Sequence, residues 1–136
     1  MIKKSCLFFY TISSDLPLGY SDIYLFTNGK YEYNKSVIYG SCFTKIIYEN
    51  QSENQDKFIS DSGKKVNVSA TTIDNAQVMT KDGERIPGKI IKSGSKVMIL
   101  DMYIKGDNIL ILIKEESSNI SGWVNSDALD EISCTP

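Results

Sequence analysis

Histidine is absent from the 136 residues of this chain, and its absence narrows the available chemistry. Histidine is the usual general base near neutral pH, the commonest metal ligand and the base that activates serine or cysteine nucleophiles. The remaining carboxylate clusters, at Glu115-Glu116 and at Asp127, Asp130 and Glu131, lie in polar, turn-like sequence where carboxylates are solvated, and no calcium-loop motif is present. We therefore expect a protein that is not an enzyme and that holds no cofactor or metal.

Arginine is nearly absent as well, because Arg85 is the only one among 15 basic residues. The net charge is −2 and the pI is near 5.1. Bidentate clamps for phosphate or guanine need arginine, and an acidic chain has no electrostatic footprint for nucleic acid. We expect no nucleic-acid partner.

Cysteine is sparse, and Cys6, Cys42 and Cys134 lie far apart without a C-x-x-C spacing. Such an odd set favours buried or free thiols in a reducing compartment over a disulfide framework or a zinc site. Long apolar runs are missing too. The run from Cys6 to Tyr10 is too short for a signal peptide, and no stretch approaches the roughly 20 apolar residues of a membrane span. We expect a cytoplasmic protein with no membrane partner.

Short β-forming runs separated by turn residues follow one another along the whole chain, which predicts an all-β fold. Asn28-Gly29 is the strongest hairpin signal, because both positions tolerate positive φ. The first half therefore reads as an antiparallel β-meander over residues 1–58. Its predicted strands are residues 2–13, Asp22 to Phe26, Tyr31 to Tyr33, Ser36 to Tyr39, and Ser41 to Tyr48.

A polar, turn-rich stretch between about residues 50 and 65 separates this meander from a second series of short strands. We expect a second unit over residues 59–136, with strands at closely spaced intervals that favour a small barrel or sandwich. Twelve of the 14 aromatic residues lie before the second unit. That asymmetry suggests that the two units have separately built cores. The predicted strands are residues 66–72, 76–80, 89–91, 96–103 and 108–114.

Two runs in the second unit bear on its packing. Ile109 to Ile113 has no polar alternate, so it must be covered on both faces, by the first unit or by a partner. Trp123 is the only tryptophan and lies between Gly122 and Val124. We expect its indole to be a largely buried core anchor, with the glycine allowing a neighbouring backbone to come close.

Residues 66–132 resemble the bacterial Src-homology-3-like (SH3-like) domain family. The resemblance is carried by a Gly-Lys-x-x-x-x-Gly-x-x-Val stretch at 88–97, by the Gly106-Asp107 turn, and by the Gly-Trp-Val strand that runs into a short turn at 122–129. It implies a small barrel of five to six strands that is used for binding, not catalysis.

Tyrosine is the most abundant aromatic residue, and seven of the eight tyrosines lie in the first unit. Most of them are expected in the core, and a few at an interface, because tyrosine combines a large contact area with a polar tip. Tyr31 and Tyr33 share one strand face and flank Glu32, so we expect these two to be exposed.

The leading functional hypothesis is a non-catalytic inhibitor or immunity-type protein that blocks a partner protein, such as a toxin or defence enzyme, stoichiometrically. A cell-envelope or peptidoglycan-binding accessory module is the alternative and depends on the SH3-like resemblance. A third reading, a small hydrolase that uses Cys42 or Cys6, has no base to activate the thiol. A homodimer remains open. The predicted binding residues are Tyr31, Tyr33, Tyr24, Glu32 and Asp127.

Overall fold

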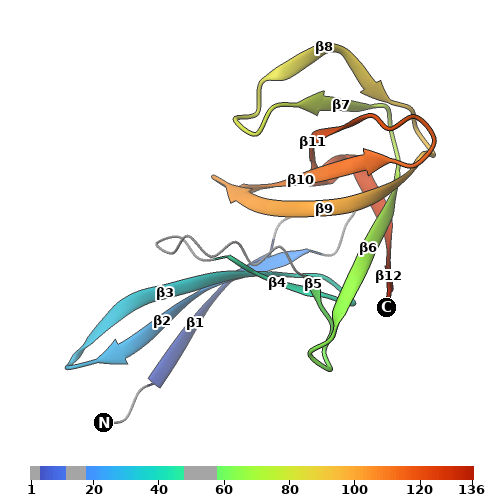
Figure 1. The fold of residues 1–136 in the computed structure, drawn as a ribbon. Coiled ribbons are helices and arrows are strands. Elements are labelled where there is room, and N and C mark those ends of the chain that lie inside the picture. Colours follow the sequence, from blue (N-terminus) through green and yellow to red (C-terminus); the bar gives the residue numbers. More distant parts are fainter. Residues whose placement is uncertain (1–3, 12–17, 48–57) are drawn as a thin grey trace.

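The structure is a computed structural model that describes residues 4–11, 18–47 and 58–136, and within them it is all-β (Figure 1). The first five strands are β1 (Lys4–Thr11), β2 (Gly19–Thr27), β3 (Lys30–Tyr39), β4 (Thr44–Ile47) and β5 (Phe58–Ile59). The others are β6 (Lys65–Thr72), β7 (Ala76–Met79), β8 (Arg85–Ile91), β9 (Lys96–Lys105), β10 (Asn108–Glu115), β11 (Ser121–Asn125) and β12 (Leu129–Thr135). A 3₁₀ turn, η1 (Ser126–Ala128), precedes β12.

All of the strand pairs are antiparallel, and they form one sheet in the order β1-β2-β3-β4-β5-β6-β9-β10-β11-β7-β8, with β12 paired to β6. Within residues 66–132 the path runs from β6 to β8, and among the described strands β8 pairs with β7 alone, not with β6 or β12. The expected closed barrel over 66–132 is therefore wrong, because the sheet stays open. Its weakest step is β11 to β7, where only Trp123 and Met79 are paired.

The predicted hairpin is confirmed, and it joins β2 to β3. Asn28 has φ 53° and Gly29 has φ 84°, and Thr27 pairs with Lys30 across the turn. The two strands expected at 31–33 and 36–39 form the single strand β3. A register shift opposite Ile23 and Tyr24 lets β3 continue through the polar residues between them.

One cluster of buried residues draws on both predicted units. Ile38, Phe43 and Phe58 from the first unit belong to the same cluster as the β6, β9 and β10 residues, and Phe43 and Phe58 meet edge to face at 5.2 Å between ring centroids. The expected cover of the apolar run is also present. Four of its five side chains are buried, and Leu112 is half-buried. Within the described ranges, no helix is long and apolar enough to cross a membrane.

Two contacts tie the meander to the C-terminal strands. Cys42, in the loop after β3, forms a disulfide with Cys134 on β12, with their Cα atoms 6.2 Å apart. Lys45 Nζ on β4 lies 3.1 Å from Asp101 Oδ1 on β9 and 5.6 Å from the centroid of the Phe58 ring. The expectation of free thiols is thus wrong for two of the three cysteines. The sequence separation of 92 residues concealed a pairing that only the fold brings about.

Trp123 is half-buried and lies outside the main core, so the prediction of a core anchor is wrong. Side chains alternate along β11, and the inward position belongs to Val124, which is fully buried. The indole instead meets the Tyr103 ring edge to face at 5.0 Å. The predicted role of Gly122 is confirmed, because a Cβ there would lie 2.2 Å from Val78 Cγ1 and 3.5 Å from the Met79 carbonyl oxygen of β7.

Candidate protein-binding surface

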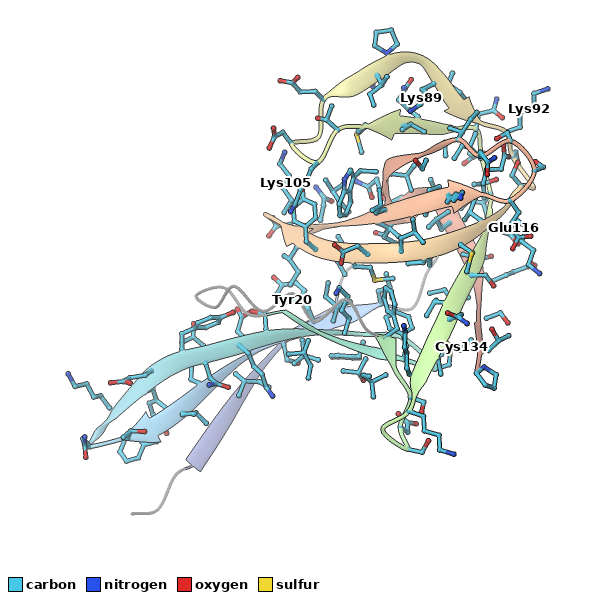
Figure 2. All side chains as sticks on the ribbon, in the orientation of Figure 1. Tyr20, Lys89, Lys92, Lys105, Glu116 and Cys134 are labelled. Carbon is cyan, nitrogen blue, oxygen red and sulfur yellow. A yellow bond between two sulfur atoms is a disulfide. The ribbon has the colours of Figure 1, made fainter. Side chains whose placement is uncertain are left out.

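The candidate surface lies on the part of β2 and β3 that extends away from the core, which we call the arm and define as residues 22–36. Figure 1 shows β1, β2 and β3 leaving the rest of the molecule together, with the β2–β3 turn at the far end. Tyr20, labelled in Figure 2, marks the base of the arm and packs against the core. One face of the sheet therefore continues from the core onto a projecting hairpin.

Aromatic side chains line that face. Cross-strand neighbours in an antiparallel pair share a face, and every second residue along a strand returns to it. Starting from Tyr20 opposite Ile38, the register places Asp22 opposite Ser36, Tyr24 opposite Tyr33, and Phe26 opposite Tyr31. We call the last four residues, Tyr24, Phe26, Tyr31 and Tyr33, the aromatic face.

The four rings form two cross-strand pairs. Tyr24 and Tyr33 meet edge to face, with centroids 5.6 Å apart, and Phe26 and Tyr31 are tilted at 4.9 Å. Tyr31 is 59% exposed, whereas the other three rings are half-buried. The expected exposure of Tyr31 is confirmed, and Tyr33 is partly covered. In each pair, the contact between the two rings restricts how far either ring can rotate.

A chain of hydrogen bonds between side chains lies at the core-side end of the aromatic face. Ser36 Oγ donates a hydrogen bond to Asp22 Oδ1 at 2.5 Å, and Ser36 Oγ and Tyr33 Oη are 2.6 Å apart. Since the single Ser36 proton goes to the carboxylate, the Tyr33 hydroxyl is the donor to Ser36. Ser36 is buried, and its two hydrogen bonds fix the orientation of the Tyr33 ring.

Glu32 and Asp127 do not join this surface. Glu32 pairs with Leu25 on the opposite face of the arm, where Lys30 and Lys35 also lie, opposite Thr27 and Ile23. Asp127 is exposed in η1, between β11 and β12, and its backbone N–H donates to Asn125 Oδ1. Of the five predicted binding residues, the structure brings together the three tyrosines.

Asp22, Phe26 and Ser36 belong to the surface although they were not predicted. The alternation of Tyr20, Asp22, Tyr24 and Phe26 along β2 was a readable signal for two of them. Ser36 could not be predicted from alternation. In a regular strand, residues on one face are two apart, whereas the register shift in β3 places Ser36 on the same face as Tyr33, three residues away.

Other possible sites among the described residues lack the groups that chemistry needs. No cluster of histidine, cysteine, aspartate and glutamate that could hold a metal is found in residues 4–11, 18–47 and 58–136. A cavity of about 150 Å³ between β5, β6 and β9 is lined by apolar side chains together with Lys65 and Asn67, so it contains no carboxylate or thiol.

Glu115 is buried, which corrects the expectation that its cluster is solvated. Hydrogen bonds from Ser118 and Ser95, assisted by the charge of Lys92, lower the pKa of the Glu115 carboxyl, although burial opposes them. A general acid needs a raised pKa, so this carboxylate is tuned in the opposite direction.

Comparison of the chain with protein-family models, with curated proteins and with solved structures found no match.

Proposed function

We propose that this protein binds another protein through the aromatic face and blocks it stoichiometrically, as an inhibitor or immunity-type protein does. The observation that carries the proposal is the two pairs of aromatic rings on a projecting arm, with Tyr31 59% exposed. Interfaces concentrate their energy in a few Tyr, Trp or Arg anchors, and tyrosine loses little conformational entropy on binding. An exposed tyrosine beyond the core, Tyr31, paired with a second ring fits this role.

We further propose that β6 to β12 have the SH3-like topology that the sequence resembles. The supporting feature is the strand order β6-β9-β10-β11, with the β7–β8 hairpin between β6 and β9 in the chain and η1 leading into a last strand that returns to β6. On this proposal the C-terminal unit is the scaffold that holds the arm, and it needs no catalytic group.

The test is capture of the partner by the tagged full-length chain from cells of its own host, followed by an affinity measurement. Replacing Tyr31 and Tyr33 together by alanine should weaken binding by about 2 kcal/mol or more, roughly 30-fold. The double variant should still be folded, which a cooperative thermal unfolding transition would show. Stoichiometric inhibition would appear as a titration of the partner's activity that ends at a fixed molar ratio.

Met98 and Leu100 provide the matched control, because they are exposed apolar residues on β9, outside the arm. Their double alanine variant should bind like the wild type. An unchanged affinity for the folded Tyr31 and Tyr33 variant would place the interface elsewhere, and turnover of a substrate by the purified chain would end the proposal.

The second candidate, an envelope or peptidoglycan accessory module, is favoured by one observation, the Cys42–Cys134 disulfide. Structural disulfides persist in oxidising compartments and are rare in the cytosol. Alkylating free thiols in living host cells before lysis distinguishes a cytoplasmic location from one in the cell envelope. Two protected cysteines together with retention on purified cell wall support the envelope role, whereas three alkylated cysteines support the cytoplasmic inhibitor.

A further inference from the structure

We propose that Asn28 is a site of spontaneous covalent modification, where the folded chain converts the side-chain amide to aspartate and isoaspartate through a cyclic imide formed with Gly29. The inference goes beyond the proposed function and does not depend on it. It starts from the turn that joins β2 to β3 at the far end of the arm (Figure 1), where both residues are exposed and both have positive φ.

The two groups that react are not held by hydrogen bonds. Thr27 pairs with Lys30 across the turn, so the pairing of β2 with β3 does not use the N–H of Gly29. Neither that N–H nor the Asn28 side chain takes part in a hydrogen bond of the described residues. A Cβ built on Gly29 would have nothing within 4 Å, so the space around the reacting atoms is open.

Two comparable positions elsewhere in the described residues are protected. The sequence Asp-Gly forms the same imide, but the N–H of Gly83 donates to the Thr80 carbonyl oxygen at 2.9 Å. The side chain of Asn125 accepts a hydrogen bond from the Asp127 N–H through Oδ1, and the next residue, Ser126, is buried. The β2–β3 turn therefore differs from these positions in leaving both the amide and the attacking nitrogen accessible.

The reaction needs no partner except water. The Gly29 nitrogen loses its proton and bonds to Asn28 Cγ, and the Cγ–Nδ2 bond breaks with release of ammonia. Water then opens the imide, at Cγ to give aspartate or at the main-chain carbonyl carbon to give isoaspartate. The attack is favoured because the reacting groups are already neighbours, and glycine has no Cβ to shield the nitrogen.

Conversion alters the part of the arm that carries its most exposed ring. Both products add a negative charge at the turn, and isoaspartate also inserts a side-chain carbon into the main chain. A hairpin turn of this kind depends on defined backbone dihedral angles, so the longer main chain no longer matches the two strands. Phe26 and Tyr31, whose centroids are 4.9 Å apart, are the ring pair next to the turn. We therefore expect isoaspartate to loosen this pair.

The test compares the full-length, disulfide-bonded chain when folded and when unfolded in guanidinium chloride, both incubated at mildly alkaline pH. Peptide mass spectrometry, with fragmentation that distinguishes isoaspartate from aspartate, gives the rate of conversion at each asparagine. Comparing one site between the folded and the unfolded chain cancels the intrinsic effect of the following residue. Because exposed turns open at little free-energy cost, folding should slow conversion less than about tenfold at Asn28 and more than about a hundredfold at Asn125.

Asn28→Gly is the control variant, because a Gly-Gly turn keeps the positive φ angles but has no side-chain amide. It should remove both products from the turn and leave the rate at Asn125 unchanged. Equal protection of Asn28 and Asn125 by folding, or conversion of Asn28 in the unfolded chain alone, would overturn the inference. The converted chain, separated by its added charge, should show faster hydrogen exchange in the arm than the unconverted chain, and equal exchange would contradict the loosening.

Discussion

Gly122 is the residue at which the fold is least tolerant of an added methyl group. A Cβ there would lie 2.2 Å from Val78 Cγ1, and Val78 is fully buried. We expect Gly122→Ala to destabilise the protein by about 1–3 kcal/mol through overpacking, measured by urea unfolding. Val78→Ala opens the space, so the double variant should be more stable than the sum of the two single changes predicts. Simple additivity would show that the contact is not the cause.

Glu115 makes stability depend on pH in a defined direction. Its hydrogen bonds from Ser118 and Ser95 lower the pKa of the folded carboxyl below the ordinary value of 4.5. The ionised carboxylate therefore stabilises the folded state above that ordinary pKa, and the contribution is lost as the pH falls toward the lowered one. We expect the wild type to lose stability over this acidic range and Ser118→Ala to lose less. If the free energy of unfolding, measured with urea, falls equally with pH in the wild type and in Ser118→Ala, the prediction is wrong.

Trp123 and Glu115 show where reading single residues failed. The size of an indole and the polarity of a neighbouring Glu-Glu pair are averages over many proteins, whereas the position of a side chain on its strand is set by register. Val124 takes the inward place on β11, so the larger residue points outward. Composition could not reveal which of two adjacent residues the core would accept.

The β2–β3 turn determines how the arm is held together. Gly29 has φ 84°, and nothing lies within 4 Å of a Cβ built on it, so alanine there suffers from backbone conformation alone. We expect Gly29→Ala to cost roughly 1–2 kcal/mol and Gly29→Asn less, since asparagine tolerates positive φ. Hydrogen exchange should report faster opening of arm amides with little change in β9 and β10. A loss spread evenly over the molecule would argue against an independently opening arm.

Strand positions were the best-predicted elements, because alternation and turn residues are local properties. The Asn28-Gly29 hairpin and the strands at 96–103 and 108–114 are present close to their expected bounds. β5 and β12 were not predicted. β5 has only two residues, and β12 pairs with β6 across a register shift at Asp130 and Ser133 that interrupts its alternation.

The disulfide acts at the scale of the whole molecule, because it joins the loop after β3 to the last strand. A cross-link that closes a loop of this length restricts the unfolded chain, and it should contribute about 4 kcal/mol. We expect replacing Cys42 and Cys134 by serine to lower the free energy of unfolding by about that amount, with Cys6→Ser as the control. Reduction of the wild type should have the same effect. An unfolding transition that is unchanged by both the serine replacements and the reduction would contradict the prediction.

Long-range pairings were beyond the reach of sequence reasoning. Lys45 with Asp101 and Cys42 with Cys134 join residues whose spacing along the chain carries no signal. The aromatic face was half-predicted for the same reason. The tyrosines stood out by number, while the partners across the hairpin depended on one register shift.

The disulfide also determines how the molecule would respond to a pull on its two ends. Covalent closure between Cys42 and Cys134 shields every residue between them from tension, so only residues 1–41, which include the arm, and residues 135–136 can extend. The oxidised chain should lengthen to at most about 150 Å before the bond itself bears load, against about 460 Å for the reduced chain. Single-molecule force spectroscopy with and without reductant measures this difference. The segment that gives way first would be the one that carries the aromatic face, so tension could remove the binding surface while the remaining sheet stays folded.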